Sequence, residues 1–184
     1  MILEHSPVIP AKMAARRIHL EASSLYVATL PLPNDGAFHW WFTCVDSGGK
    51  CSRHHWTTYT NDLLGPEKYV EEPLPNGAPA VMQNLPVLGF YRISNYTLVD
   101  VDTFRNACSQ VFKEASLKQQ KALPNRAAGI SCRTWVTTVI TQIISEERAQ
   151  EVERVVRARS KMKSDEYATC SLWGRPYTTV VEDV

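Results

Sequence analysis

The 184-residue chain lacks an excess of charge of either sign, since 20 Lys and Arg side chains against 19 Asp and Glu leave a formal net charge of +1. Such a chain has no broad electrostatic field to attract nucleic acid or an anionic membrane surface, so neither is expected as a partner. It also lacks any apolar run near the ~20 residues that a membrane-spanning helix requires. We therefore expect no membrane span.

Other absences bear on location and architecture. The first twenty residues have no apolar stretch after a basic region, so we expect no signal peptide. We expect a cytoplasmic location. The five cysteines are an odd number without the spacing of a disulfide framework, and a chain of this length can build a core without them. We expect reduced thiols, one domain over residues 1–184 and no cofactor; the oligomeric state stays open.

Strand patterns precede helix patterns along the chain. Residues 38–45 and 51–58 are rich in aromatic and β-branched side chains and flank a Gly-Gly turn, which predicts a hairpin. Further strand patterns occupy residues 17–30, 87–94 and 177–181, and helical periodicity occupies residues 101–115, 132–144 and 146–162. This order predicts an α+β fold, with an antiparallel sheet packed by helices.

Residues 61–86 interrupt these patterns with five prolines. Proline removes a backbone donor and disfavours regular structure, and long loops often border functional sites. We expect a long Pro-rich loop or lid here, placed at the entrance to the functional pocket.

The helix expected over residues 132–144 begins at a cysteine. Ser131 is a natural N-cap, which places Cys132 at the first helical position beside Arg133. Unpaired backbone N–H groups, the helix dipole and the guanidinium would all favour the thiolate there. The alternative is packing, because free cysteine is among the most buried residue types.

His39 is the candidate partner of this thiol. It opens the first hairpin strand and is followed by Trp40 and Trp41, so its imidazole is either half-buried and structural or a general base in an apolar wall. If Gly48-Gly49 is a two-residue turn, His39 lies opposite Thr58, which makes Thr58 a supporting residue. A slip of one residue would reverse these faces.

The order of a histidine strand, two further strands and a cysteine helix resembles circularly permuted papain-like enzymes, which include NlpC-type hydrolases, PPPDE peptidases and lecithin retinol acyltransferases. A closer resemblance is to an uncharacterised fungal domain family with a His-Trp strand and a Cys-Arg-x-Trp-Val helix. The matching residues are His39-Trp40, Arg53 and the segment from Ser131 to Val136. The resemblance implies a Cys132–His39 dyad and a substrate pocket that we assign to Trp40, Trp41, Arg53 and Trp135.

Two other binding sites are less favoured. Cys44, Cys51, His54 and His55 are zinc-ligand types, but adjacent strand residues point to opposite faces, so no metal is expected. The basic run at residues 154–163 follows four glutamates on the same expected helix, which indicates a solvated mixed-charge face.

Two function classes remain open. One is a cysteine-dependent acyl-transfer enzyme, a hydrolase or acyltransferase of a small-molecule or peptide-like substrate, in which Cys132 attacks a carbonyl and His39 moves the proton. The other is a non-catalytic binding domain, or a biosynthetic cyclase or isomerase using the same pocket.

Overall fold

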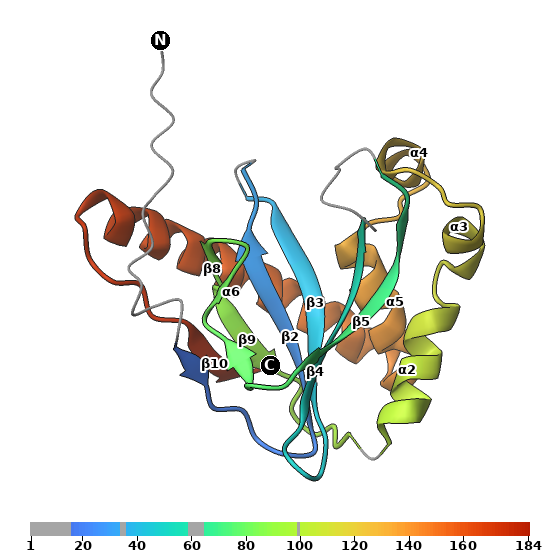
Figure 1. Cartoon of the computed structure of the whole chain (residues 1–184), viewed down its shortest axis with the longest axis horizontal. Coiled ribbons are helices and arrows are strands. Elements are labelled where there is room, and N and C mark those ends of the chain that lie inside the picture. The colour runs from blue at the N-terminus through green and yellow to red at the C-terminus, as the bar shows by residue number, and fades with distance from the viewer. Residues whose placement is uncertain (1–15, 34–35, 59–64, 99) are drawn as a thin grey trace.

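A six-stranded sheet organises the chain in the computed structural model, which describes residues 16–33, 36–58, 65–98 and 100–184 (Figure 1). The strand order is β10-β9-β2-β3-β4-β5, and all neighbours are antiparallel except β10 and β9, which are parallel. The strands are β2 (Ser24–Pro31), β3 (Phe38–Val45), β4 (Cys51–Thr58), β5 (Glu67–Leu74), β9 (Gly89–Arg92) and β10 (Val180–Asp183).

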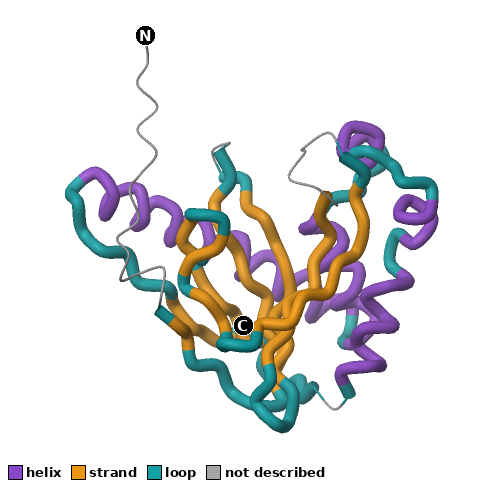
Figure 2. The backbone as a smooth tube through the Cα atoms, in the orientation of Figure 1, coloured by secondary structure: helices purple, strands orange, loops and turns teal. Residues whose placement is uncertain are grey.

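Helices and short strands flank this sheet (Figure 2). The helices are α2 (Val101–Gln110), α3 (Lys113–Leu117), α4 (Ala122–Ala127), α5 (Cys132–Ile143) and α6 (Glu146–Leu172). Two short strand pairs join β1 (Arg17–Ile18) to β6 (Ala78–Pro79), and β7 (Val81–Met82) to β8 (Leu85–Pro86). No helix in the described part of the chain has the length and apolar character needed to cross a bilayer.

Each face of the sheet has its own hydrophobic core, because successive strand residues point to opposite sides. On β3, Phe38, Trp40 and Phe42 join the core that contains the apolar side of α5. Trp41 belongs to the second core, with Phe90 and the short strands. The expected fold class is confirmed at this level: one α+β domain with a mostly antiparallel sheet packed by helices.

The expected Pro-rich loop or lid at 61–86 is wrong for residues 67–86, whereas 61–64 lie outside the described residues. Residues 67–74 form β5, and most of residues 78–86 lies in β6, β7 and β8. The prolines are compatible with these strands because β5 is an edge strand, where Pro73 need not donate to a further neighbour, and Pro79 and Pro86 end two-residue strands.

The β3–β4 hairpin is confirmed, but its turn is longer than expected. Val45 pairs with Cys51, so the register differs by one residue from that of a two-residue Gly-Gly turn. The backbone N–H groups of Gly48 and Lys50 both bond the Asp46 carboxylate, which stabilises the wider loop. The slip overturns the prediction that His39 lies opposite Thr58.

The two strands of this hairpin separate toward their far end. Their pairing stops at Phe42 and His54, although β2 stays paired with β3 as far as Phe38, and β5 stays paired with β4 as far as Thr58. Figure 1 shows β3 diverging from β4 and β5 in this region. Residues 38–41 of β3 therefore have a strand neighbour on one side only among the described residues.

The helical predictions are confirmed in position and corrected in extent. The helix expected at 101–115 divides into α2 and α3, because Phe112 adopts a left-handed backbone conformation with φ 56°. Helix α6 continues ten residues beyond the expected end at 162, to Leu172. Helix α5 begins at Cys132, as predicted.

Candidate functional site

The first turn of α5 places Cys132 against the separated part of β3. Ser131 caps the helix, since its hydroxyl accepts from the Thr134 backbone N–H and the Thr134 hydroxyl accepts from the Ser131 N–H. The Cys132 Sγ lies 3.8 Å from the carbonyl oxygen of Phe38. The thiol thus contacts β3 backbone in the stretch where β4 no longer pairs with it.

The surroundings of Cys132 do not favour its thiolate overall, contrary to the expectation from the sequence. Burial raises the pKa of the Cys132 thiol above its usual value, and this exceeds the opposing effects of the Trp40 and Arg133 backbone N–H groups and the Arg126 guanidinium. The helix start supplies the donors that the sequence indicated, but the surrounding protein also removes water. The direction of this shift favours the neutral thiol of Cys132 over the thiolate.

A pocket of about 400 Å³ opens beside Cys132. Its walls combine the β2–β3 turn, the start of β3 and side chains from three helices. The lining residues are Leu32, Gly36, Ala37, Phe38, Trp40, Arg126, Ser131, Cys132, Arg133 and Arg157. No described residue of 65–86 lines this pocket, so this part of the expected lid does not border it.

Three guanidinium groups give the pocket its polarity. Arg126 comes from α4, Arg133 from α5 and Arg157 from α6. Arg126 is held by Glu67, whose carboxylate is 4% exposed and lies 2.6 Å from the guanidinium. Arg133 lies 3.5 Å from Glu153.

His39 does not form the predicted dyad. Its ring stacks on Trp41, with centroids 5.9 Å apart, and therefore lies on the face of β3 opposite α5. Its Nε2 is 3.3 Å from Nδ1 of His55. The physical reason is strand alternation: Phe38 and Trp40 point toward α5, so His39 between them points away.

The environment of His39 keeps its imidazole neutral. Burial lowers its pKa to about 4, and the positive charge of Arg53 adds to the effect. Burial lowers the pKa of His55 further, to about 2. Both rings are uncharged at pH 7, so one nitrogen of the pair donates to the other.

The other predicted pocket residues are dispersed. Trp40 lines the pocket, whereas Trp41 is buried on the opposite face of the sheet. Arg53 bonds Glu72 on that opposite face, with Nε 2.9 Å from Oε2. Trp135 is fully buried and donates to the Cys108 carbonyl, so it belongs to the core. These three assignments to the pocket are wrong, because strand and helix periodicity directs each side chain elsewhere.

The supporting residues divide in the same way. Ser131 and Arg133 line the pocket beside Cys132, as their position in the sequence indicated. Thr58 ends β4, where it pairs with Glu67 of β5. The pairing of β4 with β3 stops at His54, so the register does not place Thr58 opposite His39.

Sequence reasoning missed Arg126 and Arg157. Arg126 lies two residues after a proline in a short helix, and Arg157 lies in the basic run that was interpreted as a solvated face. The local sequence pattern of α6 does not place Arg157 near the start of α5. Only the packing of α6 against α5 brings it to this pocket.

The four zinc-ligand types do not converge. Cys44 and His54 lie on the α5 face, whereas Cys51 and His55 lie on the other face of the sheet. The described residues contain no group of three or more His, Cys, Asp or Glu side chains placed to hold a metal ion.

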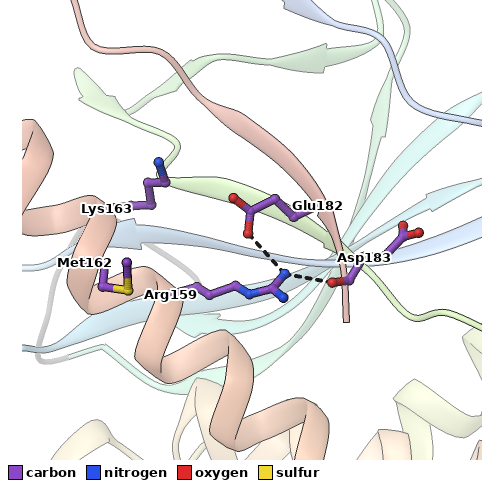
Figure 3. Close-up of a pocket in the computed structure, with 5 residues that line it drawn as sticks. All are labelled: Arg159, Met162, Lys163, Glu182 and Asp183. Atoms are coloured by element: carbon purple, nitrogen blue, oxygen red, sulfur yellow. Dashed lines mark hydrogen bonds and ion pairs between the residues drawn. The ribbon is translucent and has the colours of Figure 1, made fainter.

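A second hollow of about 550 Å³ lies between α6 and β10. Arg159 occupies it and bonds both the Glu182 carboxylate, at 3.0 Å, and the Asp183 carbonyl oxygen, at 2.7 Å (Figure 3). Lys163 also lines the hollow and pairs with Glu166, so both cations there already have carboxylate partners in this chain. The pocket beside Cys132 is therefore the better candidate for a ligand.

Comparisons of the chain with protein-family models, curated proteins and solved structures find no match.

Proposed function

We propose that the chain is a cysteine-dependent acyl-transfer enzyme in which Cys132 is the nucleophile. The observation that carries this proposal is the position of its sulfur: at the start of a capped helix, beside a 400 Å³ pocket and next to β3 backbone that β4 does not cover. A carbonyl group in the pocket would lie near the sulfur and near backbone N–H donors.

The chemistry follows from these groups. The sulfur would bond to the carbonyl carbon, and the leaving alcohol or amine would take up a proton as its bond to that carbon breaks. Water or a second acceptor would then cleave the thioester. His39 contacts His55 on the far face of β3, so in this proposal water carries the thiol proton away.

The proposal includes that the chain is related to permuted papain-like enzymes and acts on a small biosynthetic metabolite. It is supported by the chain order, with β3 and β4 preceding a helix that begins at Cys132 and packs on the sheet. It departs from the resemblance in the orientation of His39.

A second candidate is a non-catalytic domain that binds a small molecule in the same pocket. The raised pKa of the Cys132 thiol and the absence of an imidazole contact to it, among the described residues, favour this alternative. Both candidates use the same pocket, so a covalent test separates them.

The test is acetylation by p-nitrophenyl acetate, followed by intact-mass and peptide mass spectrometry. The acyl-transfer proposal expects one acetyl group on Cys132, formed faster than on the half-buried Cys51 and Cys170 and lost on standing in water. The Cys132→Ser variant should give no such adduct. Equal labelling of all accessible thiols, or none at Cys132, would leave the binding-domain candidate.

A further inference from the structure

The charge of the pocket beside Cys132 is not balanced by this chain. Arg126 faces Glu67 and Arg133 faces Glu153, so two of its guanidinium groups have carboxylate partners. Among the described residues, no carboxylate lies within 4.0 Å of the Arg157 guanidinium. Arg157 is exposed to solvent, and the pocket thus has three guanidinium groups against two paired carboxylates.

We infer that this pocket recognises the carboxylate of a small organic acid, and that this carboxylate pairs with the Arg157 guanidinium. The inference names the ligand class of the proposed function and rests on it for the role of the pocket. It uses arginine side chains from α4, α5 and α6, which could hold a ligand whether or not the thiol reacts.

The apolar residues that line the pocket favour an organic ligand. Leu32, Phe38 and Trp40 line the pocket together with the cations, and Leu32 has most of the exposed apolar surface among these three. Leu32 is 41% exposed, so a ligand would remove apolar surface of this side chain from water. An inorganic anion would gain the charge interaction but leave this apolar wall uncovered.

The charge count favours a carboxylate over a phosphate. One unmatched guanidinium neutralises a monoanion, whereas a phosphate ester at pH 7 carries close to two charges and would keep an excess in a partly apolar pocket. The planar fork of arginine also matches the two oxygens of a carboxylate. The hollow beside α6 offers no unpaired guanidinium, because Arg159 faces Glu182, and its other cation, Lys163, faces Glu166.

Calorimetric titration of the full chain with hexanoate tests the inference, and hexanamide is the uncharged probe of similar shape. Hexanoate should bind at least tenfold more tightly than hexanamide. Arg157→Gln should remove most of that preference. Arg154→Gln, three residues earlier on α6, should retain it, because Arg154 pairs with Glu151 and does not line the pocket.

The location of binding is checked by protection from iodoacetamide, an uncharged reagent. Hexanoate should slow the modification of Cys132 without slowing that of Cys170, which lies on α6 outside the pocket. Equal affinity for hexanoate and hexanamide, an Arg157→Gln variant that keeps the preference, or sulfate binding as tight as hexanoate would overturn the inference.

The same titration on Cys132→Ser separates this inference from the proposed chemistry. That variant should bind hexanoate like the unchanged protein, since no bond to sulfur is involved. Hexanoate binding without acetylation of Cys132 would support the ligand class and reject the enzyme. Acetylation of Cys132 without selective hexanoate binding would support the enzyme and reject the ligand class.

Discussion

Nε2 of His39 lies 3.3 Å from Nδ1 of His55, across the gap that opens between β3 and β4. The bond joins the two strands on one face where their backbones no longer pair. On the other face, Cys132 contacts Phe38 of β3. The gap is thus bordered by an imidazole pair on one side of the sheet and by a thiol on the other.

The buried histidines should make stability depend on pH. His54 is fully buried and its pKa is lowered to about 4, below the usual 6.5, because burial disfavours the imidazolium. Between pH 6.5 and 4 the unfolded chain therefore binds a proton at this residue that the folded chain does not. Stability is retained above pH 6.5 and falls below it, by up to about 1.4 kcal/mol per pH unit.

Urea unfolding at pH 7.5, 6 and 5 measures this dependence. His54→Gln removes one titrating group, so its free energy of unfolding should fall less steeply with acidification. Its value at pH 7.5 can be lower, because Gln must replace the bonds to Ser52 and Tyr69. Parallel pH profiles for the variant and the unchanged protein would contradict the prediction.

Cys132→Ser should separate catalysis from packing. The volume change is small and serine is compatible with a helix start, so the free energy of unfolding should change by less than about 1 kcal/mol. Acyl transfer should fall on the order of a thousandfold, because a hydroxyl ionises far less readily than a thiol. Cys170→Ser is the control and should keep the rate. A destabilised Cys132→Ser protein with nearly normal activity would identify Cys132 as a packing residue.

Glu67→Gln should loosen the attachment of α4 to β5. Glu67 accepts from Arg126, from the Asn125 side chain and from Trp56 Nε1, so the amide loses charge-assisted bonds to several donors. Arg126 is 47% exposed and regains water, which limits the loss to about 1–3 kcal/mol. Chemical denaturation measures it. The exposed Glu114→Gln should change stability by less than about 0.5 kcal/mol, and an equal effect of both variants would contradict the assignment.

Trp135 and Trp173 form a matched pair for the core. Trp135 is fully buried, stacks on Tyr69 and contacts Phe42, so Trp135→Ala should destabilise the protein by about 3–5 kcal/mol. Trp173 is 72% exposed, and Trp173→Ala should change stability by less than about 0.5 kcal/mol. Thermal unfolding of both variants checks this. Similar melting temperatures would place the core elsewhere.

Local sequence patterns predicted where helices and strands lie better than they predicted which side chains share a face of the sheet. Alternation and turn residues located the β3–β4 hairpin, and Ser131 located the start of α5. The side of β3 to which His39 points follows from strand alternation, because Phe38 and Trp40 point toward α5. The local pattern did not give the β4 residue that His39 contacts, which is His55. The Asp46 carboxylate stabilises a wider turn, which shifts β4 by one residue against β3 and so exchanges the faces of the β4 side chains relative to His39.

Of the residues that line the pocket, those named from the sequence are Trp40 and the consecutive Ser131, Cys132 and Arg133. Ser131, Cys132 and Arg133 line the pocket together because one helix turn presents them. Arg126 and Arg157 reach it through the packing of α4 and α6, and such long-range contacts leave no local signal. The prolines in residues 67–86 led to the prediction of a loop where strands form. An edge strand such as β5 tolerates a missing backbone donor that an interior strand does not.

The separation of β3 from β4 has a mechanical consequence. The sheet is effectively two ribbons, β10-β9-β2-β3 and β4-β5, joined by the four residue pairs between Val45–Cys51 and Phe42–His54. Glu67 of the second ribbon holds Arg126, while Phe38 and Trp40 belong to the first. A small twist of one ribbon against the other would therefore change the width of the pocket without breaking either ribbon, and backbone amide exchange in residues 38–41 should report it first.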